Sequence, residues 1–335
     1  MKKALLMILM LILACVTTKA QIYLVDEDTN EAVNAASIFN NETGKLIGLT
    51  NEKGALPAEA LKIKNLTVQH INYGSKQISA ADIVNDTILI KALTFNIPGI
   101  TVNKDQKMIL RMKAYTRSYS FVDNQPVAIS EGIRNLYFKN SDEEKNPKIK
   151  TVSERAFVDR EYYDSQSMWI QAIADPDYPM FFKIKNYALY DTLKNDRKLS
   201  VYDKKGKRFV VYMKEDAKNQ TCEIVTDSGF VEAPFNMPLF RLSFTNLYIN
   251  EKYNIKNGSP KLANLLSFTR MMRIVLNKSK RFVDLVDEYY PMEFEYITKE
   301  KMTEERKDKS TKPFARPENM PGLNPLMEKA IKKCH

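Results

Sequence analysis

Short apolar runs separated by turn residues fill the chain from Gln21 to about Asn103. Turn clusters recur at intervals of about eight to twelve residues, a rhythm typical of a small β-sandwich. The runs are rich in β-branched and aromatic residues, which are favoured in strands. We therefore predict short strands at residues 22–25, 35–39, 46–49, 66–71 and 87–90.

The stretch LTNEKGALP, residues 49–57, has the composition of a turn. Gly54 can adopt a positive φ at no steric cost, and the Asn51 side chain can bond back to its own backbone. This pair lets the chain reverse between two antiparallel strands. We interpret the stretch as a turn that shapes the fold and not as a site.

A series of short motifs in residues 21–103 resembles the carboxypeptidase regulatory-like domain. The resemblance implies a transthyretin-like β-sandwich, a module that often heads larger envelope proteins of Gram-negative bacteria, including TonB-dependent nutrient receptors. Two positions depart from the family pattern: Asn51 stands where the family turn has aspartate, and Asn72-Tyr73-Gly74 replaces the usual Gly-Tyr. The motifs are, in order, Val25-Asp26, Glu31-Ala32-Val33, Ala35-Ala36-Ser37-Ile38, Thr50-Asn51-Glu52-Lys53-Gly54, Ile71-Asn72-Tyr73-Gly74 and residues 93–102.

Beyond Ile97-Pro98-Gly99 the segments become longer, more aromatic and more charged. We predict a second domain over residues 104–335, an antiparallel β-rich α+β fold, so that the whole protein is mainly β. Residues 114–119 and 129–132 also resemble uncharacterised envelope proteins, which implies no activity. Hairpins are predicted at 115–138, around Asp123-Asn124-Gln125-Pro126, and at 198–213; further strands are predicted at 221–225, 242–249 and 292–298.

Two helices are predicted in the second domain. Ser259-Pro260 precedes residues 261–276, and Asn324-Pro325 precedes residues 326–333; each pair places an N-cap residue before a proline at the first helical position. In the first segment, apolar residues recur at helical spacing from Leu262 to Leu276. The charged stretch 304–312 indicates a solvated loop or a helix end.

The N-terminus has the pattern of a secretory signal over residues 1–20. Lys2 and Lys3 precede an apolar run, and small residues at Thr18 and Ala20 favour cleavage after Ala20. An alternative is a lipid anchor at Cys15, because residues 12–15 resemble a lipobox. We therefore expect an exported protein, periplasmic or associated with the outer membrane.

Charge and cysteine content limit the partners. The formal net charge of +10 falls by three to +7 when Lys2, Lys3 and Lys19 leave with the signal, and the excess is spread along the chain. For an exported protein, nucleic acid is excluded as an expected partner, whereas peripheral association with an anionic envelope surface stays open. Cys222 and Cys334 remain in the mature chain, and a disulfide between them is also left open.

The residue sets of common hydrolases are missing from the sequence. A zinc peptidase needs a His-x-x-Glu pair, but the two histidines are His70, followed three residues later by a tyrosine, and the terminal His335. Asp26-x-Asp28-x-Asn30 lacks the glycine and glutamate of a calcium loop. We expect no catalytic, metal or cofactor residues; a hydrolase using only the carboxylates Glu154, Asp159 and Glu161 is the alternative.

Aromatic residues are dense in the second domain. They are predicted to pack in the core, or alternatively to form a ligand or partner surface. Our first hypothesis is a non-enzymatic envelope protein whose sandwich is an adaptor for a protein or glycan; a carrier of lipid or another apolar ligand ranks second. The aromatic set is Tyr162, Tyr163, Trp169, Tyr178, Phe181, Phe182, Tyr187, Tyr190, Tyr289 and Tyr290.

Overall fold

The computed structural model confirms that the chain is mainly β. Its contacts divide the chain into two compact units, Met1–Ala92 and Leu93–His335, here called unit 1 and unit 2. The predicted signal and the predicted domain boundary lie outside the described residues. The structure describes residues 21–335 except 94–107, 140–146, 175–189, 194–197, 203–207, 217–219, 228–234, 238–240, 256–260, several single positions and short stretches after residue 308.

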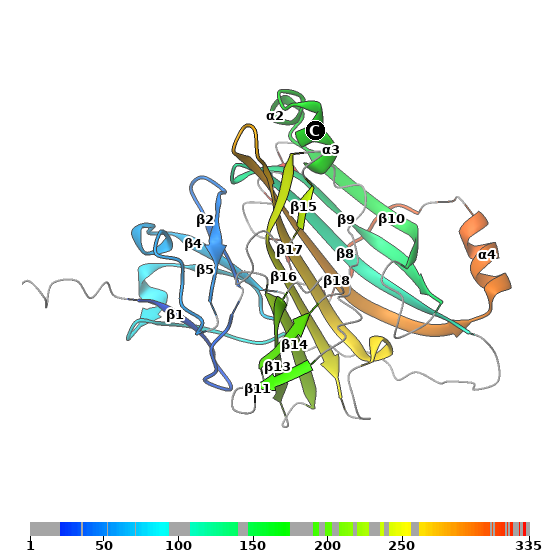
Figure 1. The fold of residues 1–335 in the computed structure, drawn as a ribbon, viewed down its shortest axis with the longest axis horizontal. Coiled ribbons are helices and arrows are strands. Elements are labelled where there is room, and N and C mark those ends of the chain that lie inside the picture. Colours follow the sequence, from blue (N-terminus) through cyan, green and yellow to red (C-terminus); the bar gives the residue numbers. More distant parts are fainter. Residues whose placement is uncertain are drawn as a thin grey trace, which may run out of the picture. The chain divides into compact units, whose positions relative to one another are not determined.

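Unit 1 consists of two small sheets (Figure 1). The three-stranded sheet has the order β1-β7-β6, with β1 and β7 parallel. The four-stranded sheet has the order β3-β2-β4-β5 and is antiparallel. The strands are β1 (Tyr23–Asp26), β2 (Ser37–Asn40), β3 (Leu46–Leu49), β4 (Leu66–His70), β5 (Gly74–Ile78), β6 (Ile83–Val84) and β7 (Thr87–Ile90), and the 3-10 turns are η2 (Ala60–Lys62) and η3 (Ala80–Asp82).

Both sheets of unit 1 contribute to one core. Leu24 and Ile88 come from the three-stranded sheet and Ile38 and Val68 from the four-stranded sheet, and all four are buried in the same cluster. The predicted β-sandwich is therefore observed, and each predicted strand overlaps an observed one. The sequence reading missed β5 and β6, because β5 is largely polar and exposed at its centre and β6 has two residues.

The turn at Asn51 forms as predicted. The Asn51 Oδ1 accepts hydrogen bonds from the backbone N–H of Lys53 (2.9 Å) and Ala55 (3.0 Å), and Gly54 has φ +74°. A Cβ at Gly54 would lie 2.4 Å from the Leu24 carbonyl oxygen, so a side chain is excluded there. The turn leads from β3 to Ala55, whose antiparallel bridge is to Tyr23 of β1. Since β3 pairs with β2, the predicted reversal between two strands that pair with each other is not observed in the described residues.

Unit 2 is built on one large antiparallel sheet with the order β10-β9-β8-β18-β17-β16-β14-β13-β12-β11, and β15 also pairs with β16 (Figure 1). Strands β8 to β10 are sequential neighbours, and the last strand, β18, returns to lie beside β8. The strands are β8 (Ile109–Val122), β9 (Gln125–Phe138), β10 (Lys148–Val158), β11 (Tyr190–Leu193), β12 (Lys198–Tyr202), β13 (Arg208–Asp216), β14 (Thr221–Asp227), β15 (Phe235–Met237), β16 (Leu242–Asn254), β17 (Leu265–Leu276) and β18 (Arg281–Ile297).

The two predicted hairpins of unit 2 are confirmed. Asp123 and Asn124 join β8 to β9, and both have positive φ, 49° and 67°, as a two-residue type I′ turn requires. Strands β12 and β13 form the second hairpin, with a turn outside the described residues. The strands predicted at 221–225 and 242–249 fall within β14 and β16, and the strand predicted at 292–298 overlaps the end of β18, which stops one residue earlier at Ile297.

Different elements pack on the two faces of the large sheet. Residues paired in register share a face, so each row of the sheet can be followed across strands. The helix α3 (Met168–Ala174) and the 3-10 turn η5 (Leu262–Asn264) pack on one side, here called the α3 face. The helix α4 (Lys299–Lys307) and the described residues of the segment 312–323 pack on the other side, here called the C-terminal face.

The predicted helix at 261–276 is wrong. This segment forms η5 followed by β17, which lies between β16 and β18. Eight of the twelve residues of β17 are buried and none is exposed, and the strand contains β-branched and aromatic residues such as Phe268, Ile274 and Val275. A strand that is buried on both faces has apolar residues at nearly every position, and some of these positions are also spaced as in a helix. Periodicity alone therefore does not distinguish a buried strand from a buried helix.

The remaining helical predictions concern the C-terminus. Residues 328, 331 and 332 of the predicted helix 326–333 are described and are helical. The charged stretch 304–312 contains the end of α4, as predicted. Among the described residues, no helix has the length and apolar composition needed to cross a membrane.

Candidate functional site

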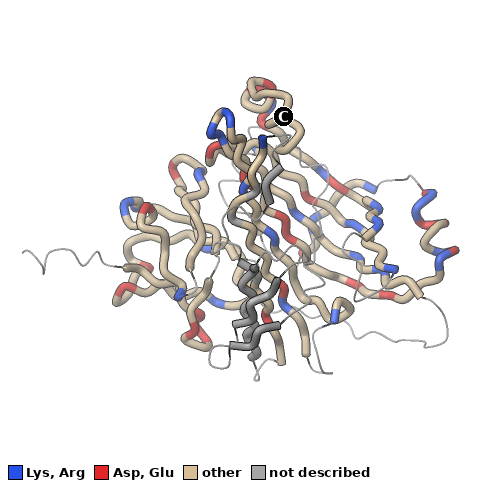
Figure 2. The backbone as a smooth tube through the Cα atoms, in the orientation of Figure 1, with Lys and Arg blue, Asp and Glu red and all other residues tan. Residues whose placement is uncertain are grey.

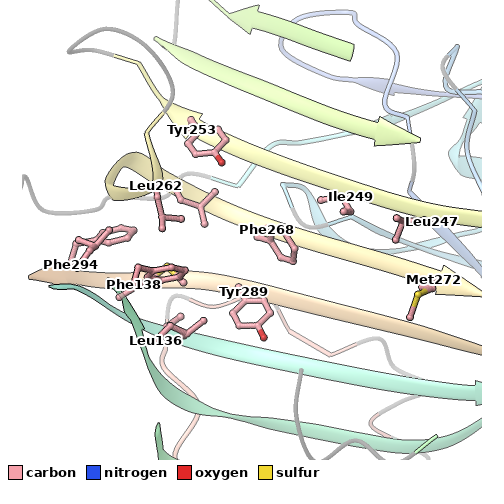
Figure 3. Close-up of a cluster of buried hydrophobic side chains, with 14 of the residues drawn as sticks. Leu136, Phe138, Leu247, Ile249, Tyr253, Leu262, Phe268, Met272, Tyr289 and Phe294 are labelled. Carbon is pink, nitrogen blue, oxygen red and sulfur yellow. The ribbon is translucent and has the colours of Figure 1, made fainter. Parts of the chain in front are cut away.

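The α3 face of the large sheet is largely apolar and buried. Figure 3 shows its main cluster, in which side chains from β9, β16, β17 and β18 converge with Leu262 of η5. Ile173 of α3 packs against this cluster and also against a second one near the β8–β9 turn. The buried members from the sheet include Leu110, Met112, Leu136, Phe138, Leu247, Ile249, Tyr253, Phe268, Met272, Ile274, Tyr289 and Phe294.

A belt of polar side chains crosses this apolar face. In one row the register aligns Ser130 of β9, Ser118 of β8, Asp287 of β18 and Arg270 of β17. Apolar rows lie on both sides of the belt along the strands: Leu110 pairs with Phe138 on one side, and Val122 with Val283 on the other. The polar belt comprises Thr116, Ser118, Ser120, Ser130, Arg134, Glu154, Arg270, Asp287 and Tyr289.

Arg134 is the first fully buried cation of the belt. Its guanidinium donates to the Thr116 hydroxyl, to the Ser130 hydroxyl at 3.3 Å and to the Glu154 carboxylate at 2.9 Å. The Arg134 side chain is 0% exposed, whereas that of Glu154 is 45% exposed, so the counter-ion is partly screened by water. Burial lowers the pKa of Arg134 despite the opposing effect of Glu154.

Arg270 is the second buried cation. It forms an ion pair with Asp287, which also accepts a hydrogen bond of 2.6 Å from the Ser118 hydroxyl. Tyr289 lies two residues along β18, and burial raises its pKa well above the usual value. Apart from Glu154, the belt is therefore a desolvated set of charges and hydroxyls within an apolar layer.

Three buried polar atoms of the belt have no hydrogen-bond partner among the described residues: Arg134 Nε, Arg270 Nε and Ser120 Oγ. Buried donors are almost always satisfied in folded proteins, because an unsatisfied donor costs about 1–3 kcal/mol. Two guanidinium N–H groups on one apolar face are therefore buried without an acceptor from the described residues.

The C-terminal face holds a second charged network. Glu131 is 0% exposed and accepts hydrogen bonds from Tyr115 (2.6 Å), Arg155 (2.5 Å) and both Nε and Nη2 of Arg316 (3.0 Å each). Burial acts to raise its pKa, but the hydrogen bonds from Arg316 and Tyr115 outweigh it, so the pKa lies below the ordinary value. Figure 2 shows that acidic and basic residues are interspersed along neighbouring strands of this sheet.

Arg117 is the buried cation of the C-terminal face. It pairs with Glu288 at 2.6 Å and donates to the Gly322 carbonyl oxygen at 2.8 Å and to the Tyr290 hydroxyl at 3.2 Å. Its guanidinium also lies 5.5 Å from the centre of the Tyr290 ring. These contacts fasten the segment 312–323 to the sheet and leave little capacity for a ligand.

The three predicted carboxylates have separate roles. Glu154 belongs to the polar belt through Arg134. Asp159 is the N-cap of α2 (Arg160–Asp164), where its Oδ1 accepts from the Tyr162 N–H at 3.1 Å, and Glu161 is exposed in the first turn of that helix. Five residues of extended chain separate Glu154 from Asp159, about 17 Å, so these two do not form a close pair.

The other residues considered from the sequence have structural surroundings. His70 is buried in β4, and its Nδ1 accepts from the Asn72 N–H at 3.1 Å. Asp26 shapes a turn by accepting from the N–H groups of Asp28 and Thr29, and no cluster of metal-binding side chains occurs within the described part of the chain. Cys222 is buried in β14; Cys15, Cys334 and His335 lie outside the described residues.

The aromatic residues divide into buried and exposed groups. Tyr289 and Tyr290 are buried in β18, as the core-packing interpretation predicts, and Tyr162 and Tyr163 pack against the cluster under α3. Trp169 is 51% exposed on α3, next to Met168 at 75%. Tyr190 begins β11. Tyr178, Phe181, Phe182 and Tyr187 lie outside the described residues.

No family model matches the chain, and no curated protein is significantly similar to it. The resemblance to the regulatory-like domain therefore stays a prediction. Of the belt residues, the sequence reading singled out Glu154 as a candidate site residue and named Tyr289 only among the aromatics. One signal was available for the others: Thr116, Ser118 and Ser120 alternate with bulky residues, which indicates a polar stripe on one face of a strand.

Proposed function

We propose that the protein is an exported, non-enzymatic binding protein that holds an apolar ligand on the α3 face of its large sheet. The observation that supports this is the lining: a buried apolar surface extends over β9, β8, β18, β17 and β16 and is crossed by the polar belt. Apolar walls with a few placed polar groups are the usual composition of small-molecule sites. Export rests on the secretory pattern of residues 1–20.

Loading of such a ligand requires part of the cover of the α3 face to move, because the lining side chains are buried. Among the described elements, α3 is suited to this movement. It has seven residues, of which Ile170 and Ala174 are buried against the sheet, while Met168 and Trp169 remain exposed. A short helix held by few buried side chains opens at lower cost than the sheet strands.

The test is to purify the mature protein from a native envelope without detergent, extract it with chloroform and methanol, and identify small molecules by mass spectrometry. An amphiphile recovered at about one equivalent supports the proposal. Protein that yields none and also fails to bind a sixteen-carbon fatty acid in solution contradicts it.

A second candidate function is the adaptor role of unit 1, supported by an exposed apolar row on its three-stranded sheet. Tyr23 (37% exposed) and Val84 (63%) both pair with Thr87, and Leu89 (43%) lies two residues further along β7 on the same face. Exposed apolar patches of this kind mark partner surfaces. Crosslinking in the native envelope tests it: a captured envelope protein should be lost with Leu89→Asp and retained with Lys62→Glu, a change at an exposed position of η2.

A further inference from the structure

We propose that the ligand of the α3 face is an amphiphile with an acidic head, a carboxylate or a phosphate monoester, which accepts hydrogen bonds from Arg134 and Arg270. This inference rests on the proposed function, since it assigns a chemical class to the ligand of the same site. It depends on the unused donors of the polar belt and on the position of the belt between two apolar regions.

The guanidinium groups of Arg134 and Arg270 each have an N–H donor that forms no hydrogen bond with the described residues. An arginine offers five N–H groups in a fixed fork. Arg134 uses its terminal nitrogens on Thr116, Ser130 and Glu154 and Arg270 uses Nη2 on Asp287, but both Nε–H groups lack an acceptor among the described residues. A carboxylate or phosphate matches this donor geometry and forms charge-assisted hydrogen bonds.

Two carboxylates on this face accept hydrogen bonds from neighbouring side chains. Asp287 accepts from both Ser118 and Arg270. Glu251, which is in register with Phe268, accepts from the Tyr253 hydroxyl at 3.0 Å. Arg134 is the cation with the weakest compensation, because its carboxylate partner Glu154 is half exposed. An added anion would therefore pair with Arg134 first.

The apolar rows on both sides of the belt suit the chain of an amphiphile. Leu110 and Phe138 lie on one side, and Met272 and Val283 lie on the other. A head group bound at Arg134 or Arg270 would thus place its hydrocarbon chain against apolar side chains in either direction along the strands. The belt specifies the head, and the apolar rows specify the chain.

The experiment compares four probes on the mature full-length protein by isothermal titration: palmitate, hexadecyl phosphate, hexadecanol and inorganic phosphate. We expect both acidic amphiphiles to bind at least about tenfold more tightly than hexadecanol, because one charge-assisted hydrogen bond changes the dissociation constant by about this factor. Equal affinity for palmitate and hexadecanol would overturn the acidic head. Inorganic phosphate binding as tightly as hexadecyl phosphate would assign the site to a free anion and overturn the amphiphile.

Variants tie the effect to the belt. Arg134→Lys keeps the charge but removes the fork, and we expect it to weaken palmitate binding about tenfold and leave hexadecanol unchanged. Arg111→Lys is the matched control, because Arg111 lies on β8 of the opposite face, pairs with carboxylates and likewise has an Nε without a partner among the described residues. An equal loss in both variants would overturn the assignment.

Ser120→Ala tests the site without changing the stability of the fold, because it removes a hydroxyl that has no partner among the described residues. We expect a lower affinity for palmitate with an unchanged melting temperature; an unchanged affinity would remove Ser120 from the site. The proposed function and this inference fail differently: if neither palmitate nor hexadecanol binds, the apolar site itself is wrong, whereas equal binding of both rejects only the acidic head.

Discussion

Two buried charge networks on opposite faces of the large sheet differ in how fully their hydrogen bonds are satisfied. On the C-terminal face, Glu131 accepts from three side chains, and Arg117 has a carboxylate, a carbonyl and a hydroxyl as partners. On the α3 face, Arg134 depends on a half-exposed carboxylate, and two arginine N–H groups have no acceptor among the described residues. The comparison teaches that a saturated network fastens a segment of the chain, whereas the polar belt retains unused donors, on which the proposed ligand site depends.

The largest expected effect is in the saturated network around Glu131 on the C-terminal face. Glu131→Ala would leave Arg316 and Arg155 without their shared carboxylate next to the Tyr115 hydroxyl. Removing one partner of a buried charge network costs about 3–5 kcal/mol. We expect the free energy of unfolding of unit 2, measured by urea denaturation, to fall by about that amount.

The control for Glu131 is Glu293→Ala, which removes an exposed carboxylate paired with Arg111 and Lys113. An exposed pair is worth at most about 1 kcal/mol. If both substitutions lower the free energy of unfolding by the same amount, the network around Glu131 is not saturated in solution, and it no longer differs from the polar belt.

The pH dependence of unfolding sharpens the same comparison. The folded pKa of Glu131 is lowered below its ordinary value of 4.5, so the unfolded state binds the proton more readily. Its contribution to stability is therefore fully present above pH 4.5 and is lost as the pH falls through the lowered folded pKa. We expect acid to destabilise the wild type more than Glu131→Gln over this range; parallel curves of unfolding free energy against pH would contradict it.

A smaller effect is expected where the segment 312–323 meets the sheet. The Phe314 ring stacks on Tyr115 with centroids 6.4 Å apart, and the Arg155 guanidinium lies 5.2 Å from the centre of the Phe314 ring. Phe314→Ala removes both contacts, which are worth about 0.5–1.5 kcal/mol for the ring pair and about as much for the cation. Native-state hydrogen exchange should show faster opening at residues 312–318, and an unchanged exchange rate would show that the Phe314 ring does not fasten the segment.

The fold could be predicted from the sequence only where the evidence is local. Hairpins such as β8–β9 follow from turn residues like Asp123-Asn124 and from alternating side chains, and both signals lie within a few residues. The strand β17 was missed because burial on both faces removes the alternation. The polar belt as a whole could not be predicted from the sequence. The strand register pairs Ser118 with Asp287 across more than a hundred residues of chain, and no local pattern determines that register.

The smallest expected effect is in the polar belt on the α3 face. The Ser120 hydroxyl is buried in β8 and has no partner among the described residues. Ser120→Ala should therefore change the free energy of unfolding by less than about 0.5 kcal/mol, or raise it, because no hydrogen bond is lost and a desolvated hydroxyl is removed. Ser118→Ala is the matched change, since its hydroxyl donates to Asp287 at 2.6 Å and its loss should cost about 1.5–3 kcal/mol. If the two serine variants lose equal stability in urea unfolding, Ser120 has a partner within the chain, and the unsatisfied belt can no longer be taken as the sign of a ligand.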